Sequence, residues 1–197
     1  MADGDILVGS VKGLTRLDRK FKVTRGTDAY KNVTDIVEYK RDIYVVHERK
    51  GTRAVSKLTA DLSGGVVMLE TPTVFSINKL SVSKTYVVMT DNYNKKLAVY
   101  NQSSKVVTGV TVPQVKSPDD VLFLSHASLL VTSYWDKNLV LLDLKTEKII
   151  WSCDQLNGSY SMTGNPSSGL IYVIGYDEKT VYIISPTGML SMMLISI

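Results

Sequence analysis

Side chains that could perform acid–base or nucleophilic chemistry are scarce in this sequence of 197 residues. Its two histidines, His47 and His126, are far apart in the chain, and no carboxylate stands beside His126 to orient it as a general base. The single cysteine, Cys153, lies in an apolar run and is expected to be a packed small hydrophobe. We therefore expect surface or turn histidines and no catalytic residue, cofactor or metal.

Cations and aromatic rings are the abundant functional side chains. The formal net charge is +4, and residues 1–57 hold 13 basic and 8 acidic residues, including all six arginines. Arginine binds phosphate or carboxylate groups through two parallel hydrogen bonds. A solvated surface with chance clustering of charge is the alternative explanation.

These side chains belong to a repeat. Each repeat consists of a short apolar strand, a polar turn and a second strand that ends at Asp, Thr, Asn or Ser. The second strands begin at regular intervals of 41 or 42 residues, at Leu14, Val55, Leu97, Leu139 and Val181. The regular interval indicates a repeat architecture.

Most of the repeats extend to four short strands, which is typical of the blade of a β-propeller. We predict an all-β fold with about five four-stranded blades in one domain, residues 1–197. The predicted blades are residues 5–26, 33–70, 78–112, 118–154 and 159–195. Burial on both sides explains why the second strand of each repeat is almost continuously apolar. A sandwich or an open meander with coincidental spacing is the alternative.

The third repeat, YVVMTDNYNKKLAVYNQSSKVV (residues 86–107), resembles the NHL-type blade signature. The matching positions are Thr90, Asp91, Asn94, Lys96, Val99, Tyr100 and Asn101. Ser133 and Gly175 replace the expected Asp in later repeats, and the second repeat is expected to have an enlarged turn, HERKGTRA. Tyr134-Trp135-Asp136 is faintly similar to the YWTD receptor type, which ranks second. The NHL resemblance implies binding of proteins or single-stranded RNA through one face.

The turns between second and third strands, together with the connections between blades, should open on one face of the blades, which we call the loop face. The predicted binding residues on it are Arg49, Lys50, Arg53, Tyr93, Lys95, Lys96, Tyr134, Trp135, Lys137, Tyr176 and Lys179. The same face should also hold Lys12, Arg25, Tyr30, Lys31, His47, Lys116 and Tyr160. Tyr93, Trp135 and Tyr176 could instead cover the apolar layer between blades. The lysines could serve only to keep the turns soluble.

A non-catalytic scaffold that binds a protein partner is the favoured function, because Trp, Tyr and Arg dominate protein interfaces. Binding of single-stranded RNA is the alternative, since cations neutralise phosphates and aromatic rings stack on bases. A metal-dependent hydrolase is less favoured. Its candidate ligands Asp35, Glu38, Asn78, Asp119 and Asp120 share no repeated position, and the last two more simply begin a strand or cap a turn.

The first repeat begins at its second strand, so the ring would lack an inner strand. We expect either part of a larger, six-bladed ring or completion by another chain. The longest uncharged apolar run is too short to span a membrane, so no membrane partner is expected. The absence of a signal sequence favours the cytoplasm, although removal of one would permit an extracellular location.

Overall fold

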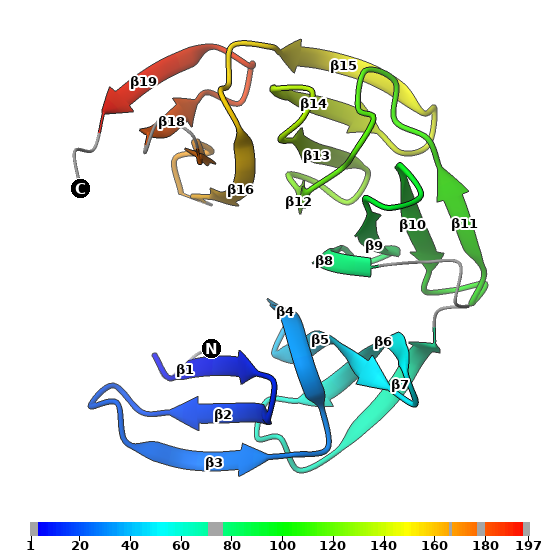
Figure 1. The fold of residues 1–197 in the computed structure, drawn as a ribbon, viewed down its shortest axis with the longest axis vertical. Helices are drawn as coiled ribbons and strands as arrows, with labels where there is room; N and C mark the ends of the chain where they lie inside the picture. The colour runs from blue at the N-terminus through cyan, green and yellow to red at the C-terminus, as the bar shows by residue number, and fades with distance from the viewer. Residues whose placement is uncertain (1–3, 71–76, 166, 177–179, 195–197) are drawn as a thin grey trace. The chain divides into compact units, whose positions relative to one another are not determined.

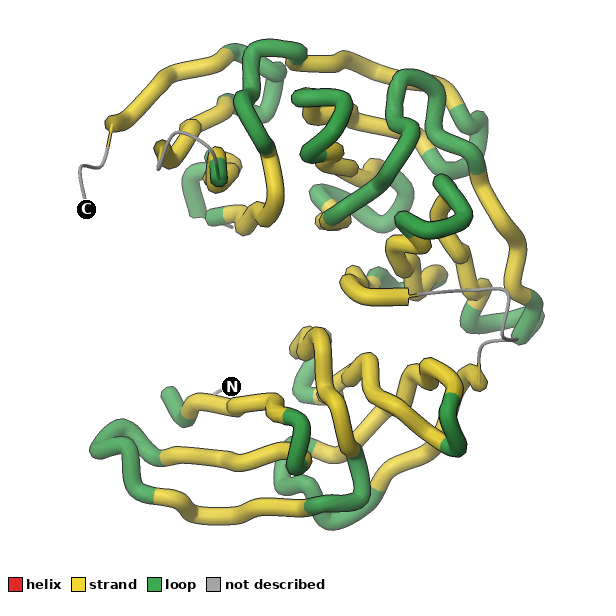
Figure 2. The backbone as a smooth tube through the Cα atoms, viewed as in Figure 1, coloured by secondary structure: helices red, strands yellow, loops and turns green. Residues whose placement is uncertain are grey.

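The computed structural model of the chain describes residues 4–70, 77–165, 167–176 and 180–194, and all its regular elements are β-strands (Figures 1 and 2). The chain divides into two compact units, residues 1–80 (unit 1) and residues 81–197 (unit 2). Each unit is described by itself. The described part of the chain contains no helix long and apolar enough to cross a membrane.

Unit 1 contains two antiparallel sheets. Blade 1 has three strands in the order β1-β2-β3, namely β1 (Ile6–Ser10), β2 (Gly13–Leu17) and β3 (Val23–Thr27). Blade 2 has four strands in the order β4-β5-β6-β7, namely β4 (Lys31–Tyr39), β5 (Asp42–Arg49), β6 (Thr52–Thr59) and β7 (Gly65–Glu70). Leu14, Ile43, Val45 and Leu58 form the apolar core between these two sheets.

The expected enlarged turn in the second repeat is wrong. Strands β5 and β6 pair in register as far as Arg49 and Thr52, which leaves only Lys50 and Gly51 between them. Both residues have positive φ, of 50° and 77°, as a tight two-residue hairpin turn of type I′ requires. The charged segment is therefore an extension of the two strands.

Unit 2 contains three four-stranded antiparallel sheets. In blade 3 the order is β11-β10-β9-β8, with β8 (Ile77–Val82) crossing the boundary between the units, followed by β9 (Tyr86–Asp91), β10 (Lys96–Asn101) and β11 (Val107–Val110). Blade 4 contains β12 (Asp120–Phe123), β13 (Ser128–Ser133), β14 (Asn138–Asp143) and β15 (Lys148–Cys153) in sequential order. Blade 5 contains β16 (Ser159–Gly164), β17 (Ile171–Gly175), β18 (Thr180–Ile184) and β19 (Leu190–Leu194), also in sequential order.

The middle strands of blade 4 are buried on both sides. In β13, Leu129 and Val131 belong to the core shared with blade 3, whereas Leu130 belongs to the core shared with blade 5. Successive side chains of a strand point to opposite faces of the sheet. A strand whose sheet packs against a blade on each face therefore has an apolar residue at nearly every position. This confirms the reason given for the continuous apolar runs. In Figure 1, β15 and β19 lie on the outer side of unit 2, with β12 and β16 on the inner side.

Candidate functional site

Two equivalent turns on the loop face of unit 2 have the same backbone form. In residues 92–95 the amide of Lys95 donates to the carbonyl of Asn92 at 3.3 Å, and in residues 134–137 the amide of Lys137 donates to the carbonyl of Tyr134 at 3.2 Å. Lys95 and Lys137 have left-handed φ angles of 58° and 54°. Lys95 and Lys137 are therefore the residues at which the chain reverses direction.

The second residue of each turn projects into solvent. Tyr93 is 82% exposed and Trp135 is 77% exposed, and Tyr176, which follows β17, is 70% exposed. The three rings therefore do not cover the apolar layer between the blades. Large aromatic side chains held on rigid turns are available for binding.

Side chains beside Trp135 fix its turn. The Ser133 hydroxyl donates to Oδ2 of Asp136 at 2.7 Å and accepts the Asp136 amide at 3.3 Å. The Lys116 amide also donates to Oδ2 of Asp136, at 2.6 Å. The hydrogen bonds tie the turn both to its strand and to the connection that enters blade 4. Ser133, which departs from the NHL pattern, still serves to cap the turn.

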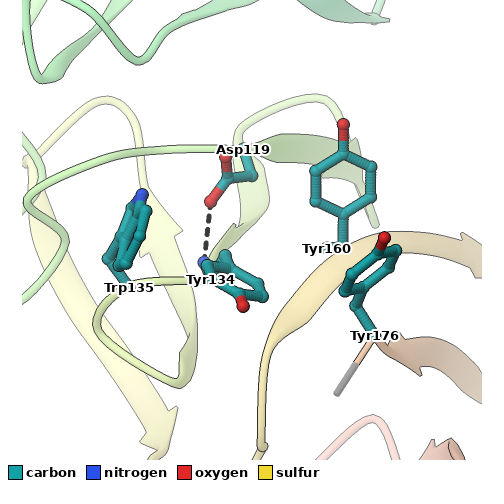
Figure 3. A pocket seen from close by; sticks show the side chains of 5 residues that line it. All are labelled: Asp119, Tyr134, Trp135, Tyr160 and Tyr176. Atoms are coloured by element: carbon teal, nitrogen blue, oxygen red, sulfur yellow. Dashed lines mark hydrogen bonds between the residues drawn. The ribbon is translucent and has the colours of Figure 1, made fainter. Parts of the chain in front are cut away.

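Four aromatic residues and one carboxylate surround a pocket of about 370 Å³ in unit 2, which we call the aromatic pocket (Figure 3). Among the described residues its lining consists of Asp119, Tyr134, Trp135, Tyr160 and Tyr176. The first three come from blade 4 and the connection before it, Tyr160 from the start of β16, and Tyr176 from the end of β17. The volume lies within the range of about 300 to 1,000 Å³ typical of small-molecule pockets.

The aromatic rings form a continuous series. Tyr134 contacts Trp135 edge to face, with centroids 5.1 Å apart and planes at 90°. Tyr134 and Tyr176 are 6.4 Å apart at 72°, and Tyr160 and Tyr176 are 6.1 Å apart at 48°. In Figure 3, Trp135 and Tyr160 stand on opposite sides, with Tyr134 and Asp119 between them.

Asp119 supplies the only charged side chain among the described lining residues. Its Oδ2 accepts the amide of Tyr134 at 2.7 Å, and it is also hydrogen-bonded to the side chain of Asn92. Burial raises the pKa of the Asp119 carboxyl, and the negative charge of Asp136 raises it further, while the two hydrogen bonds oppose the shift. No lysine or arginine stands beside this carboxylate among the described residues that line the pocket.

Only three of the predicted binding residues, Tyr134, Trp135 and Tyr176, meet in the aromatic pocket. Lys96 is in strand β10, where its aliphatic chain lies over Gly109, and not in the turn where it was expected. The remaining predicted residues of unit 2 that are described, Tyr93, Lys95 and Lys137, lie in the turns but are not part of the pocket lining. Lys179 is outside the described residues.

The predicted basic residues of the second repeat belong to unit 1 and are engaged with their own blade. The Arg49 guanidinium lies 3.1 Å from a carboxylate oxygen of Glu70. The Arg53 guanidinium donates to the carbonyl of Asn32 at 2.8 Å. Of the three cations, only Lys50 is in the turn itself, where it is exposed. Arg49 and Arg53 are strand residues, which corrects their placement in a loop.

The expectation of a surface or turn histidine is wrong for His47. It lies in β5, is 2% exposed, and packs edge to face on Tyr30 at 5.0 Å. Its Nδ1 is 3.0 Å from the carbonyl of Glu48 and its Nε2 is 2.8 Å from the Ser56 hydroxyl. His126, by contrast, is exposed in the connection between β12 and β13, at the opposite end of β13 from Tyr134.

The carboxylates of the innermost strands join neighbouring blades. In unit 2, Oδ2 of Asp120 accepts the Ser161 hydroxyl at 3.0 Å and the Met162 amide at 2.9 Å, both in β16. In unit 1, Oδ2 of Asp35 accepts the Leu80 amide at 2.7 Å. Nowhere in the described part of the chain do three or more His, Cys, Asp or Glu side chains gather as a metal site would require.

Sequence reasoning did not place Asp119 or Tyr160 among the binding residues. Tyr160 is on the predicted loop face, but it lies at the start of a strand and not in a turn position such as the one that Tyr93 and Trp135 share. Asp119 directly precedes β12, and its position in the sequence predicted only the start of a strand or the cap of a turn. Only the packing of blade 5 beside blade 4 brings the two residues together.

The sequence matches no family model and no curated protein. The fold matches a streptogramin B lyase structure with a TM-score of 0.75 and 15% identity, over 99% of this chain and 66% of that one. It also matches a catalytically inactive virginiamycin B lyase from Staphylococcus aureus with quinupristin, with a TM-score of 0.74 and 14% identity, over 100% of this chain and 68% of that one. A nidogen/laminin complex matches with a TM-score of 0.74 and 10% identity, over 93% of this chain and 72% of that one.

The similarity to these structures confirms the β-propeller fold with five blades. At 10 to 15% identity it shows the fold alone. The chain spans about two thirds of the length of the two lyases. The similar structures thus include a lyase and a protein complex on one architecture, and the function has to be argued from the site.

Proposed function

We propose that this chain is a non-catalytic, NHL-like binding propeller that recognises a protein partner through the loop face of unit 2, with the aromatic pocket as the anchor point. The observation that carries the proposal is the exposure of Trp135 and Tyr176, at 77% and 70%. Hydrogen bonds fix the turn that holds Trp135, and the Tyr176 amide donates to the carbonyl of Gly158. Exposed Trp and Tyr side chains that lose little freedom on binding are characteristic of interface hot spots.

The environment of the pocket favours a protein partner over single-stranded RNA. Stacking of bases uses aromatic faces next to cations that neutralise phosphates. Here the charged group in the lining is the carboxylate of Asp119, and Asp136 caps the adjacent turn. A phosphate backbone near these two carboxylates would be repelled.

The positions of the histidines support a non-catalytic role. A general base must come within hydrogen-bonding reach of the reacting group. His47 is buried in unit 1 with both ring nitrogens engaged, and His126 is at the far end of β13 from the pocket. Asp119 then remains as the single carboxylate in the described lining, accompanied there by tyrosine hydroxyls and by no histidine.

Affinity capture with matched variants tests the proposal. Trp135→Ala and Tyr176→Ala should each reduce recovery of a specific partner at least tenfold, because each removes a wall of the pocket. Tyr93→Ala is the matched control, because Tyr93 has the equivalent place in the turn of blade 3 and is even more exposed. Equal recovery with Trp135→Ala and with Tyr93→Ala would contradict the proposal.

Two further measurements address the other functions. Fluorescence anisotropy with single-stranded RNA should show no binding that depends on Trp135. Steeply salt-dependent binding that is lost in Trp135→Ala would instead identify RNA, and not a protein, as the ligand. Turnover of a lactone or ester panel, abolished by Asp119→Asn, would overturn the non-catalytic assignment.

A further inference from the structure

The shape of the aromatic pocket suits a rounded ligand group. Its contacting ring planes meet at 90°, 72° and 48°, so none of these three pairs is parallel. A flat group such as a nucleobase or a guanidinium stacks best on parallel or coplanar faces. Rings tilted toward one another instead form a concave cup, in which a compact, nearly spherical group contacts several rings together.

The charge distribution in the cup favours a cation. The face of an aromatic ring carries the negative part of its quadrupole, and cations within about 6 Å of a ring centroid are attracted to it. Asp119 adds a full negative charge, and no lysine or arginine is among the described lining residues. Burial raises the pKa of the Asp119 carboxyl, and a cation bound beside it would favour its charged form.

The hydrogen-bonding capacity of the cup distinguishes among cations. Asp119 already accepts the Tyr134 amide at 2.7 Å and is bonded to Asn92. An unmodified ammonium brings three N–H donors that must be satisfied when water is removed, and a guanidinium brings five. Each methyl group replaces one donor with an apolar surface that can contact a ring.

We propose that the aromatic pocket binds a methylated ammonium group carried on a lysine side chain of the protein partner. The proposal rests on the proposed function and names the chemical group that the loop face recognises. Tyr134, Trp135, Tyr160 and Tyr176 form the walls, and Asp119 supplies the charge. Aromatic cages of this kind are a recurrent solution for quaternary ammonium groups.

The test uses the acetylated amide of lysine with zero or three methyl groups, the uncharged carbon analogue of trimethyllysine, and choline as a free small molecule. Binding is followed by NMR through the indole N–H of Trp135, assigned by comparison with the Trp135→Ala spectrum. Trimethyllysine should bind at least tenfold more tightly than both lysine and the carbon analogue. Equal affinity for lysine and trimethyllysine would overturn the proposal, as would equal affinity for the carbon analogue.

Variants connect the binding to the pocket. Tyr160→Ala and Asp119→Asn should each weaken binding of trimethyllysine at least fivefold, whereas Tyr93→Ala should leave it unchanged. Thermal unfolding of each variant verifies that the fold is retained. An unchanged affinity in Asp119→Asn would overturn the role of the carboxylate, and choline binding tenfold tighter than trimethyllysine would overturn the assignment to a partner's side chain.

Failure of this proposal is distinguishable from failure of the proposed function. A partner that depends on Trp135 but is captured equally well after enzymatic or synthetic removal of its lysine methylation would overturn the methylammonium proposal alone. Recovery that does not depend on Trp135 would overturn the proposed function.

Discussion

His47 in unit 1 is a buried histidine with a defined tautomer. A carbonyl oxygen only accepts hydrogen bonds, so the contact of Nδ1 with the carbonyl of Glu48 at 3.0 Å requires the proton on Nδ1. Nε2 of the neutral ring then accepts the Ser56 hydroxyl at 2.8 Å. The ring is thereby held against Tyr30 as a core group.

The buried, neutral state of the His47 ring makes the free energy of unfolding depend on pH. Burial lowers its pKa, and the charges of Arg49 and Arg53 add to this, whereas the bond to the Glu48 carbonyl opposes it. Since the pKa in the folded state is below the ordinary value of about 6.5, the neutral ring contributes stability above that pH, and this contribution is lost as the pH falls through the folded-state pKa.

We therefore expect the melting temperature to fall more steeply between pH 7.5 and pH 5 in the natural protein than in His47→Gln. The variant should be less stable at pH 7.5, by about 1 kcal/mol. Differential scanning calorimetry at several pH values measures both quantities. Parallel pH curves for the two proteins would show that His47 does not carry the dependence.

Gly175 explains one departure from the NHL pattern by packing. A Cβ at this position would lie 2.6 Å from the ring of Tyr182 and 3.0 Å from the carbonyl oxygen of Asn157. Tyr182 is 2% exposed, and its hydroxyl accepts the amide of Asn157 at 3.0 Å. Burial and this hydrogen bond hold the Tyr182 ring in place, so the Asp of the NHL pattern would not fit at position 175.

Gly175→Ala should destabilise the protein by about 1 to 3 kcal/mol, because a new methyl group would displace a buried ring. Gly64→Ala is the matched control, since its Cβ would meet nothing within 4 Å. Urea unfolding of the two variants gives the comparison. Equal midpoints would mean that Tyr182 moves aside at little cost.

Innermost strands within a unit are held together by side chains that accept backbone amides of the next blade. Asp120 reaches from β12 to Met162 in β16, and the Ser81 hydroxyl oxygen reaches from β8 to the amide of Phe123 in β12, at 3.0 Å. The described strands of adjacent blades within unit 2 form no ladder with one another, so these hydrogen bonds help to position one blade beside the next. Asp120 was one of the candidate metal ligands in the sequence.

Removal of the Asp120 carboxylate should uncouple blades 4 and 5. Asp120→Ala leaves the Met162 amide and the Ser161 hydroxyl without this acceptor, and we expect a loss of about 1 to 3 kcal/mol in the free energy of unfolding. Asp154→Ala, at an exposed position, should change stability by less than about 0.5 kcal/mol. Hydrogen exchange should show faster exchange of β16 amides in Asp120→Ala alone, and equal protection in both variants would contradict the coupling.

At the scale of the whole molecule, the repeat made the fold predictable. The middle strands of blades 2, 3 and 4 are almost continuously buried, and residues such as Leu97 and Leu139 recur at one interval with no exposure. The aromatic pocket was only partly predictable, because Trp135 follows the repeat but Asp119 and Tyr160 do not. Their proximity depends on how one blade packs against the next, and no periodic pattern encodes it.

Charged strand ends account for the remaining differences. Arg49 and Arg53 were predicted in an enlarged turn, HERKGTRA, of the second repeat. In the structure they extend the paired strands β5 and β6, and Arg49 forms an ion pair with Glu70 of β7, on the far side of β6. His47 was also predicted at the surface or in a turn, because it begins the same charged segment and is followed by the exposed Glu48.

In the turn at residues 134–137, the residues that stabilise the turn differ from the residue that faces solvent. Ser133 and Asp136 form the side-chain hydrogen bonds that cap the turn, and Lys137 adopts the conformation that reverses the chain, yet the ring that projects farthest into solvent is that of Trp135. We therefore expect a change at position 135 to alter the wall of the pocket without altering how the blade folds. Such an arrangement allows the ligand preference of a propeller to diversify by single substitutions, and it makes this turn a natural starting point for engineering a new specificity.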